Sequence, residues 1–231
     1  MAWETHLLRL LQGPLAGLAL LVFTAGLLGQ TIRLWLLTEK VDPARVRGSA
    51  DTPLQDKADR RLNLVRYLAR LRTTALGNSA VLVPISLIFH VCLVVVPLFI
   101  KGHNVLLRVS FGLALPSFSD GLADLLTMVV LGCGLFFLAR RLLVKKVRVI
   151  TGAGNVLLLL LVMLVFLTGL LARHQLVLDY NLMLLLHMAG GALLLMIIPF
   201  SKFFHMIFFF FGRFLIVNEY SIGRAGRIWR F

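Results

Sequence analysis

Apolar residues come in five long blocks along the chain, separated by polar or basic segments. The blocks show none of the strict alternation that is typical of half-buried β-strands, and each reaches roughly the 20 residues that a helix needs to cross a hydrocarbon core. They cover residues 14–37, 79–100, 120–139, 156–172 and 181–217. Because backbone polar groups in lipid must be bonded internally, the pattern predicts an all-α membrane bundle of five transmembrane helices rather than a β-barrel.

Local signals refine the ends of these helices. The last block is longer than one bilayer crossing, and Pro199 is the expected bend because proline removes a helix hydrogen bond. Asp120 opens the third block and is a candidate N-cap. Pro97 and Gly102 are expected to twist or end the second helix close to His103.

Lysine and arginine are distributed unevenly between the two sides of the predicted bundle. Twenty of the 24 fall on one side, mostly in the segment 38–78, in the basic turn 140–148 and after residue 201. The positive-inside rule therefore predicts a periplasmic N-terminal stretch 1–13, a membrane domain 14–217 and a cytoplasmic tail 218–231. Within the first cytoplasmic segment, residues 56–73 have helical apolar spacing with a basic opposite face, which fits a helix on anionic lipid, a dock for a partner, or both.

Composition changes the picture mainly by excluding alternatives. The chain is 59% hydrophobic and carries a formal net charge of +14. In a soluble protein this charge would indicate nucleic acid, but here the cations lie between apolar blocks and indicate topology and anionic lipid. The two cysteines, Cys92 and Cys133, cannot build a four-cysteine cluster and form no CxxCH motif for covalent haem. We interpret them as small buried apolar residues.

Histidines inside the apolar blocks are the candidate functional residues. His90 and His187 are surrounded by apolar residues, where ionisable groups are costly and usually functional. His187 and His205 are 18 residues apart, about five helical turns, which predicts one shared helix face and a separation of roughly 27 Å. Neutral imidazole is a good iron ligand, and two axial histidines on one iron suit electron transfer. Gly190 and Gly191 would give room to a flat macrocycle or to a close helix contact.

Four stretches resemble a known family. They are HMAGGALLLMIIPFSKFFH at 187–205, FHVCLVVVPLFIKGHN at 89–104, SFGLALPSFSDGLADLLT at 110–127 and RRLLVKKVRVITGAGNVLLL at 140–159. Over roughly residues 14–215 the chain resembles the membrane cytochrome b, or gamma, subunit of respiratory nitrate reductase. The resemblance is closest to the branch found in sulfate-reducer transmembrane redox complexes, namely the membrane cytochrome b of the high-molecular-weight cytochrome complex and the Tmc-type cytochrome b.

The resemblance implies two b-type haems, each held by two histidines. Matching depths in the predicted topology pair His90 with His205 for the inner haem and His103 with His187 for the outer one. The sequence departs from the nitrate reductase pattern at Ile100, where that pattern has the second histidine of this helix. His103 lies three residues further on, and His174 is the alternative ligand.

Apart from the resemblance, Lys101, Arg108 and Lys202 are candidates to pair with haem propionates, and Asp124 is a candidate proton acceptor beside a quinol. The alternatives are interfacial snorkelling cations and an interfacial carboxylate.

The resemblance also implies the remaining expectations. The chain would be a subunit of a respiratory complex in the bacterial inner membrane, with other membrane subunits beside it. It would pass electrons between menaquinol or a periplasmic multihaem cytochrome c and a cytoplasmic iron–sulfur subunit, and it would be no enzyme alone. The alternatives are a cofactor-free membrane anchor and a small transporter.

Overall fold

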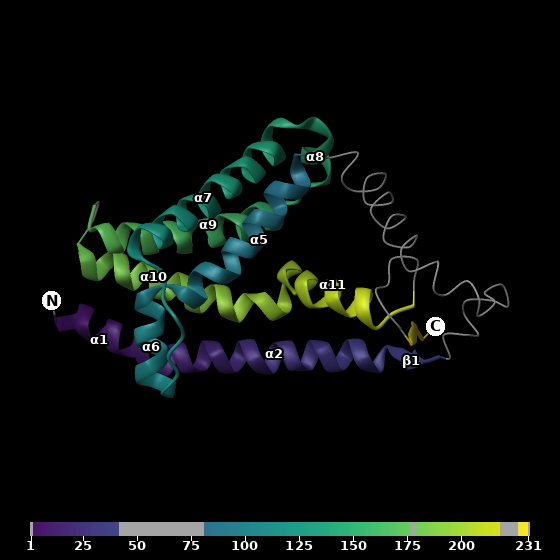
Figure 1. Cartoon of the computed structure of the whole chain (residues 1–231), viewed down its shortest axis with the longest axis horizontal. Coiled ribbons are helices and arrows are strands. Elements are labelled where there is room, and N and C mark those ends of the chain that lie inside the picture. Colours follow the sequence, from purple (N-terminus) through teal and green to yellow (C-terminus); the bar gives the residue numbers. More distant parts are fainter. Residues whose placement is uncertain (1, 42–80, 177–178, 218–225, 231) are drawn as a thin grey trace. The chain divides into compact units, whose positions relative to one another are not determined.

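A computed structural model of the chain describes residues 2–41, 81–176, 179–217 and 226–230, without the side chains of residues 2–5 and 12. It contains five helices long and apolar enough to cross a membrane, as predicted (Figure 1). Their bounds are His6–Leu36, Leu82–Phe99, Asp120–Leu143, Ala153–His174 and Tyr180–Phe200. At most a third of the most apolar window of each helix is buried in the protein, so most of this apolar surface is available to lipid.

The chain divides into two compact units, which are described separately. Unit 1 comprises residues 1–13 and 74–191, and unit 2 comprises residues 14–73 and 192–231. The interpretation of 56–73 as an amphipathic helix falls outside the described residues, as do most of the polar segment 38–78 and most of the tail 218–231.

Unit 1 is built around helix α7 (Asp120–Leu143), which packs against α5 (Leu82–Phe99) and α9 (Ala153–His174) (Figure 1). The buried residues of α7 form one stripe of small or β-branched side chains: Ala123, Thr127, Val130 and Gly134. A Cβ added at Gly134 would lie 2.9 Å from Cγ of Met163 on α9. Small residues therefore allow the close helix contact that stabilises bundles in lipid.

Short helices connect the spans of unit 1. Helix α6 (Lys101–Phe111) follows α5 after a break at Ile100, and α8 (Lys145–Ile150) joins α7 to α9. The sequence predicted only a connection at 104–119, so α6 is an addition to that prediction. Ile100 has extended backbone angles, φ −79° and ψ 137°. The second span therefore ends between Pro97 and Gly102, where the sequence predicted a twist or an end.

Unit 2 combines helix α2 (Ala16–Leu36) with the C-terminal part of the chain. Strand β1 (Thr38–Lys40) pairs antiparallel with β2 (Arg227–Trp229), with Thr38 opposite Trp229. The regular secondary structure in the described part of the chain is therefore helical apart from one two-stranded ribbon, and residues 227–229 of the predicted tail are a strand. A small core of Leu34, Phe211 and Ile216, with Trp229 against it, lies beside the ribbon.

The last apolar block is interrupted rather than continuous. Helix α10 (Tyr180–Ile197) ends in a 3₁₀ turn, Ile198–Phe200, and a second 3₁₀ turn, Lys202–Phe204, precedes α11 (His205–Phe214). Pro199 is buried in this interruption, where a bend was predicted. The prediction that His187 and His205 share one face of one helix is wrong, because the five-turn count requires an unbroken helix.

Candidate haem-binding histidines

The His187 imidazole is held against helix α9. Its Nδ1–H donates to the carbonyl oxygen of Val165 at 2.9 Å. In an α-helix that carbonyl also faces residue 169, four positions on. A Cβ added at Gly169 would lie 2.9 Å from Cε1 of His187 and 3.0 Å from Nδ1. The absence of a side chain at residue 169 therefore creates the space that the ring occupies.

The His103 imidazole is held by the break between α5 and α6. Its Nδ1–H donates to the carbonyl oxygen of Pro97 at 2.8 Å. In a continuous helix this carbonyl would accept from the backbone N–H of residue 101. Because the chain turns at Ile100, the carbonyl of Pro97 can accept from the histidine ring instead. The break that the sequence predicted thus also orients the side chain.

The rings of His103 and His187 are neighbours within unit 1. Their centroids are 5.9 Å apart and their planes are inclined by 21°. Two imidazole–metal bonds of about 2.0–2.1 Å, together with the two half-rings, separate ring centroids by about 6 Å when both rings bind one metal ion. The observed separation is therefore close to that of two histidines bound to one iron, which would lie in the planes of both rings because the Nε2 lone pair lies in the ring plane.

The other two predicted ligands, His90 and His205, have the same kind of hydrogen bond at Nδ1. Nδ1–H of His90 donates to the carbonyl oxygen of Ser86 at 2.6 Å, and Nδ1–H of His205 donates to that of Lys202 at 2.7 Å. A carbonyl oxygen only accepts, so Nδ1 carries the proton in all four histidines, and in the neutral form of each ring Nε2 carries the lone pair. This tautomer, fixed by a carbonyl behind the ring, is typical of metal-binding histidine. His90 lies in unit 1 and His205 in unit 2, and their pairing stays a prediction.

The segment between α6 and α7 is fastened beside His103. Buried Asn104 donates through Nδ2 to Oγ of Ser117 at 2.9 Å and to the carbonyl oxygen of Pro116 at 3.2 Å. The backbone N–H of Phe118 donates to the carbonyl oxygen of Phe99 at 2.9 Å. These bonds fix the direction in which α6 leaves α5, and with it the position of the His103 ring.

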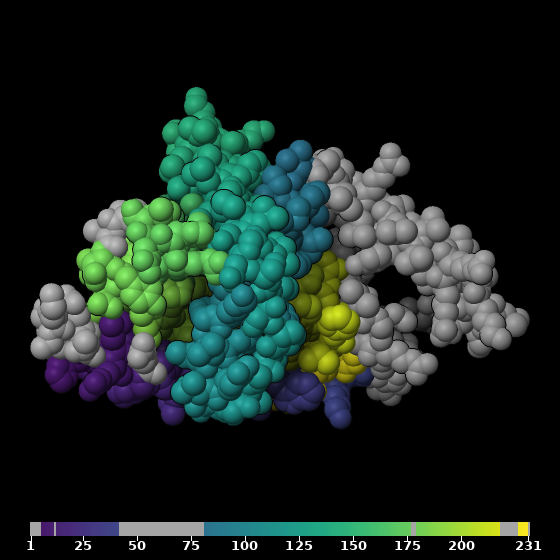
Figure 2. Space-filling view, turned by 60° about the vertical axis from the view of Figure 1, so that its left-hand side comes forward, coloured from purple at the N-terminus to yellow at the C-terminus, as the bar shows by residue number. Residues whose placement is uncertain are grey.

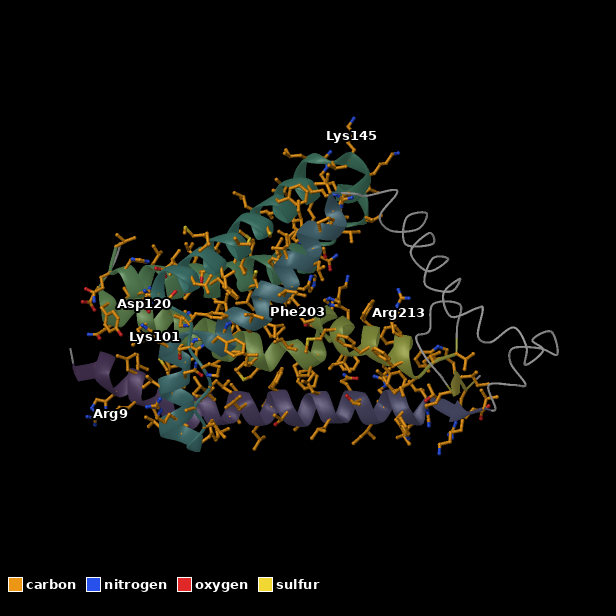
Figure 3. The ribbon with its side chains drawn as sticks, in the orientation of Figure 1. Arg9, Lys101, Asp120, Lys145, Phe203 and Arg213 are labelled. Atoms are coloured by element: carbon orange, nitrogen blue, oxygen red, sulfur yellow. The ribbon has the colours of Figure 1, made fainter. Side chains whose placement is uncertain are left out.

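An ion-pair cluster joins α6, α7 and α9 at the same end of unit 1. Asp120 bonds Lys101 at 3.0 Å (Figure 3) and Arg173 at 3.3 Å. Asp124 bonds Nε of Arg173 at 2.8 Å and Nε2 of His174 at 3.2 Å. The prediction that Asp120 caps α7 is wrong: Ser119 occupies the cap position, and no side-chain cap bond forms.

The ion-pair cluster includes His174, the alternative haem ligand, and two of the residues predicted to contact propionates or a quinone. Nε2 of His174 is engaged by a carboxylate, and the ring beside that of His187 is that of His103. Which of the two histidines completes the outer haem stays a prediction. Lys101 and Asp124 are engaged in ion pairs, whereas Arg108 is exposed in the last turn of α6. Their contact with propionates or quinone stays a prediction, as does that of Lys202, which lies in the turn before His205.

The two glycines beside His187 have different surroundings. A Cβ at Gly190 would lie 3.1 Å from Cγ2 of Val165, which indicates helix packing, whereas a Cβ at Gly191 would meet nothing within 4 Å. The glycine that makes room for the ring is Gly169, which the sequence reasoning missed. A single glycine within the bulky apolar run of the fourth span was the available signal.

Among the described residues, no group of three or more histidines, cysteines or carboxylates is placed to hold a metal ion. A haem iron needs only two ligands from the protein, because the porphyrin supplies the others. The histidine pair on the α6 and α10 helices fits this requirement by residue type, tautomer and ring separation.

These observations define a multi-pass membrane protein with intramembrane histidines. The chain is 34% identical over 220 residues to a curated protein of the sulfate reducer Nitratidesulfovibrio vulgaris, strain Hildenborough, covering 94% of each sequence. It belongs to the same family as that protein, whose recorded name is simply "Protein". No family model and no solved structure matches the chain.

Proposed function

We propose that the protein is a membrane cytochrome b, a subunit that carries electrons across the bilayer through two b-type haems. The carrying observation is the His103–His187 pair, whose ring centroids lie 5.9 Å apart. In both rings Nδ1–H is bound by a backbone carbonyl and Nε2 holds the lone pair. The outer haem would be held by this pair, and the inner haem by His90 and His205.

When bound, haem would supply one-electron redox chemistry, and two histidines on its iron would leave no position open for oxygen. The chain's own residues orient the ligands. Gly169 gives the ring of His187 its space, while the carbonyls of Val165 and Pro97 fix both rings by accepting hydrogen bonds. Carbonyl acceptors behind the rings also raise ligand basicity, which tunes the potential of the bound metal.

The sequence resemblance supplies the wider assignment. It supports a subunit of a respiratory complex in the bacterial inner membrane. Menaquinol or a periplasmic cytochrome c would exchange electrons with the protein at the outer side, and a cytoplasmic iron–sulfur subunit would do so at the inner side. The 34% identical protein comes from a sulfate reducer, which agrees with the branch that the sequence resembles. The predicted excess of cations on the inner side would favour an acidic partner there.

Reduced-minus-oxidised spectra and the haem content of the purified protein test this function. The wild type should show a b-type α-band. His103→Ala and His187→Ala should each lose the same single haem, because each removes one ligand of one pair. His174→Ala is the matched control, since His174 bonds Asp124, and it should keep both haems. A folded preparation without haem would instead indicate a cofactor-free anchor.

A further inference from the structure

Five cations gather where α7 passes through α8 into α9, a region that we call the α8 corner (residues 140–150). They are Arg140, Arg141, Lys145, Lys146 and Arg148. The carboxylate side chains that the structure describes in unit 1 are those of Asp120, Asp124 and Asp179. All three lie near the opposite helix ends, and α7 alone is about 36 Å long. Among the side chains that the structure describes in unit 1, these cations therefore have no carboxylate partner.

Aliphatic side chains of the same corner are unusually exposed. The exposed fractions are 79% for Leu143, 86% for Val149 and 79% for Ile150. The corner stands out beyond the neighbouring helices at the top of the space-filling view (Figure 2), and Lys145 points away from it (Figure 3). Cations and exposed aliphatic groups thus alternate within a few residues, which is the composition of segments that lie in a membrane interface.

One cation of the corner also needs an acceptor. Nη1 of Arg141 is buried and has no hydrogen-bond partner among the described residues. Buried donors are nearly always bonded, and a guanidinium nitrogen binds phosphate oxygens well. This observation is independent of the charge count and also indicates an anionic ligand.

We propose that the α8 corner is a binding site for anionic phospholipid. The phosphate group is bound by the cations, with Arg141 as the innermost donor, and the acyl region contacts Leu143, Val149 and Ile150. An acidic soluble protein would match the cations but would leave the reason for the three exposed aliphatic side chains unexplained. Anionic lipid surfaces attract basic segments by charge and retain them by apolar contact. The site does not depend on the haem proposal.

The test uses the full chain in nanodiscs of phosphatidylcholine, with or without phosphatidylglycerol. An environment-sensitive fluorophore on Val149→Cys, in a Cys92→Ala/Cys133→Ala background, reports whether the corner enters lipid. Native mass spectrometry of protein from mixed micelles reports which phospholipids it retains. The variant Lys145→Gln/Lys146→Gln/Arg148→Gln removes three cations of the corner. Lys40→Gln/Arg213→Gln/Arg230→Gln removes three cations elsewhere and is the charge-matched control.

We expect the emission of the fluorophore to be blue-shifted, and more so when phosphatidylglycerol is present. Quenchers attached to lipid should reduce this emission. The corner variant should lose between tenfold and about a hundredfold of its preference for phosphatidylglycerol over phosphatidylcholine, and the control should keep it. Arg141→Gln should reduce the number of retained anionic lipids. A fluorophore that stays in water in both lipids, or is shielded only when an acidic protein partner is bound, overturns the proposal. Equal losses in both triple variants also overturn it, since they indicate net charge alone.

Discussion

Gly169→Ala tests how the protein positions the His187 ring. The added Cβ would lie 2.9 Å from Cε1 of His187, at least about 0.6 Å short of the usual 3.5–4.0 Å carbon contact. The ring cannot move away without lengthening its 2.9 Å bond to Val165 or changing its separation from His103. Overpacking of this kind typically costs about 1–3 kcal/mol, equivalent to roughly fivefold to 150-fold weaker binding of the outer haem.

Gly191→Ala is the matched control, because a Cβ there meets nothing within 4 Å. Both changes gain the same helix propensity, up to about 1 kcal/mol, so the difference between them isolates the contact with the ring. Titration of haem into the apoprotein of each variant gives the affinities, and a redox titration gives the potentials. The reasoning is refuted if Gly169→Ala and Gly191→Ala bind both haems as tightly as the wild type does.

Three further predictions concern stability. Gly26→Ala should lower the melting temperature, because the added Cβ would lie 2.6 Å from Cβ of Pro199. Gly29→Ala should not, because a Cβ there meets nothing within 4 Å. Arg227→Ala should expose the β1–β2 ribbon to proteolysis. Arg227 is buried, donates to Oγ1 of Thr38 at 2.7 Å and stacks 3.8 Å from the centre of the Trp35 ring. Arg227→Lys should restore only part of the protection, because lysine lacks the planar guanidinium group. Asp124→Asn should lower the melting temperature more than Asp120→Asn, because its carboxylate is less exposed, 18% against 52%. Equal melting temperatures within either pair, or unchanged proteolysis in Arg227→Ala, would contradict the corresponding contact.

The five spans could be predicted because an apolar run of about 20 residues directly indicates a helix that crosses the hydrocarbon core of a membrane. Helix α6 could not be predicted, because it is a short helix of mixed polarity that begins immediately after the break at Ile100. The β1–β2 ribbon joins residues 38–40 to 227–229, and three-residue strands so far apart leave no local pattern. The interruption at Pro199 was predicted as a bend, but its length was not, and this is why the five-turn argument for His187 and His205 failed.

The candidate site was predictable in its residue types and partly in its geometry. An imidazole among apolar residues is recognisable from the sequence, and Pro97 with Gly102 predicted the break that orients His103. The role of Gly169 depends on which turn of α9 faces α10, which is a tertiary contact that one sequence does not reveal. The carbonyl acceptors of Pro97 and Val165 are backbone groups and have no sequence signal of their own.

The number and ligation of haems in the purified full chain test the account most directly. Haem assay with near-infrared magnetic circular dichroism should give two b-type haems per chain, both low-spin with two histidine ligands. His103→Ala/His187→Ala should retain one haem whose spectrum is that of the other site. A folded wild-type chain with no haem, or a double variant that keeps two unchanged haems, would contradict the claim that these rings bind iron.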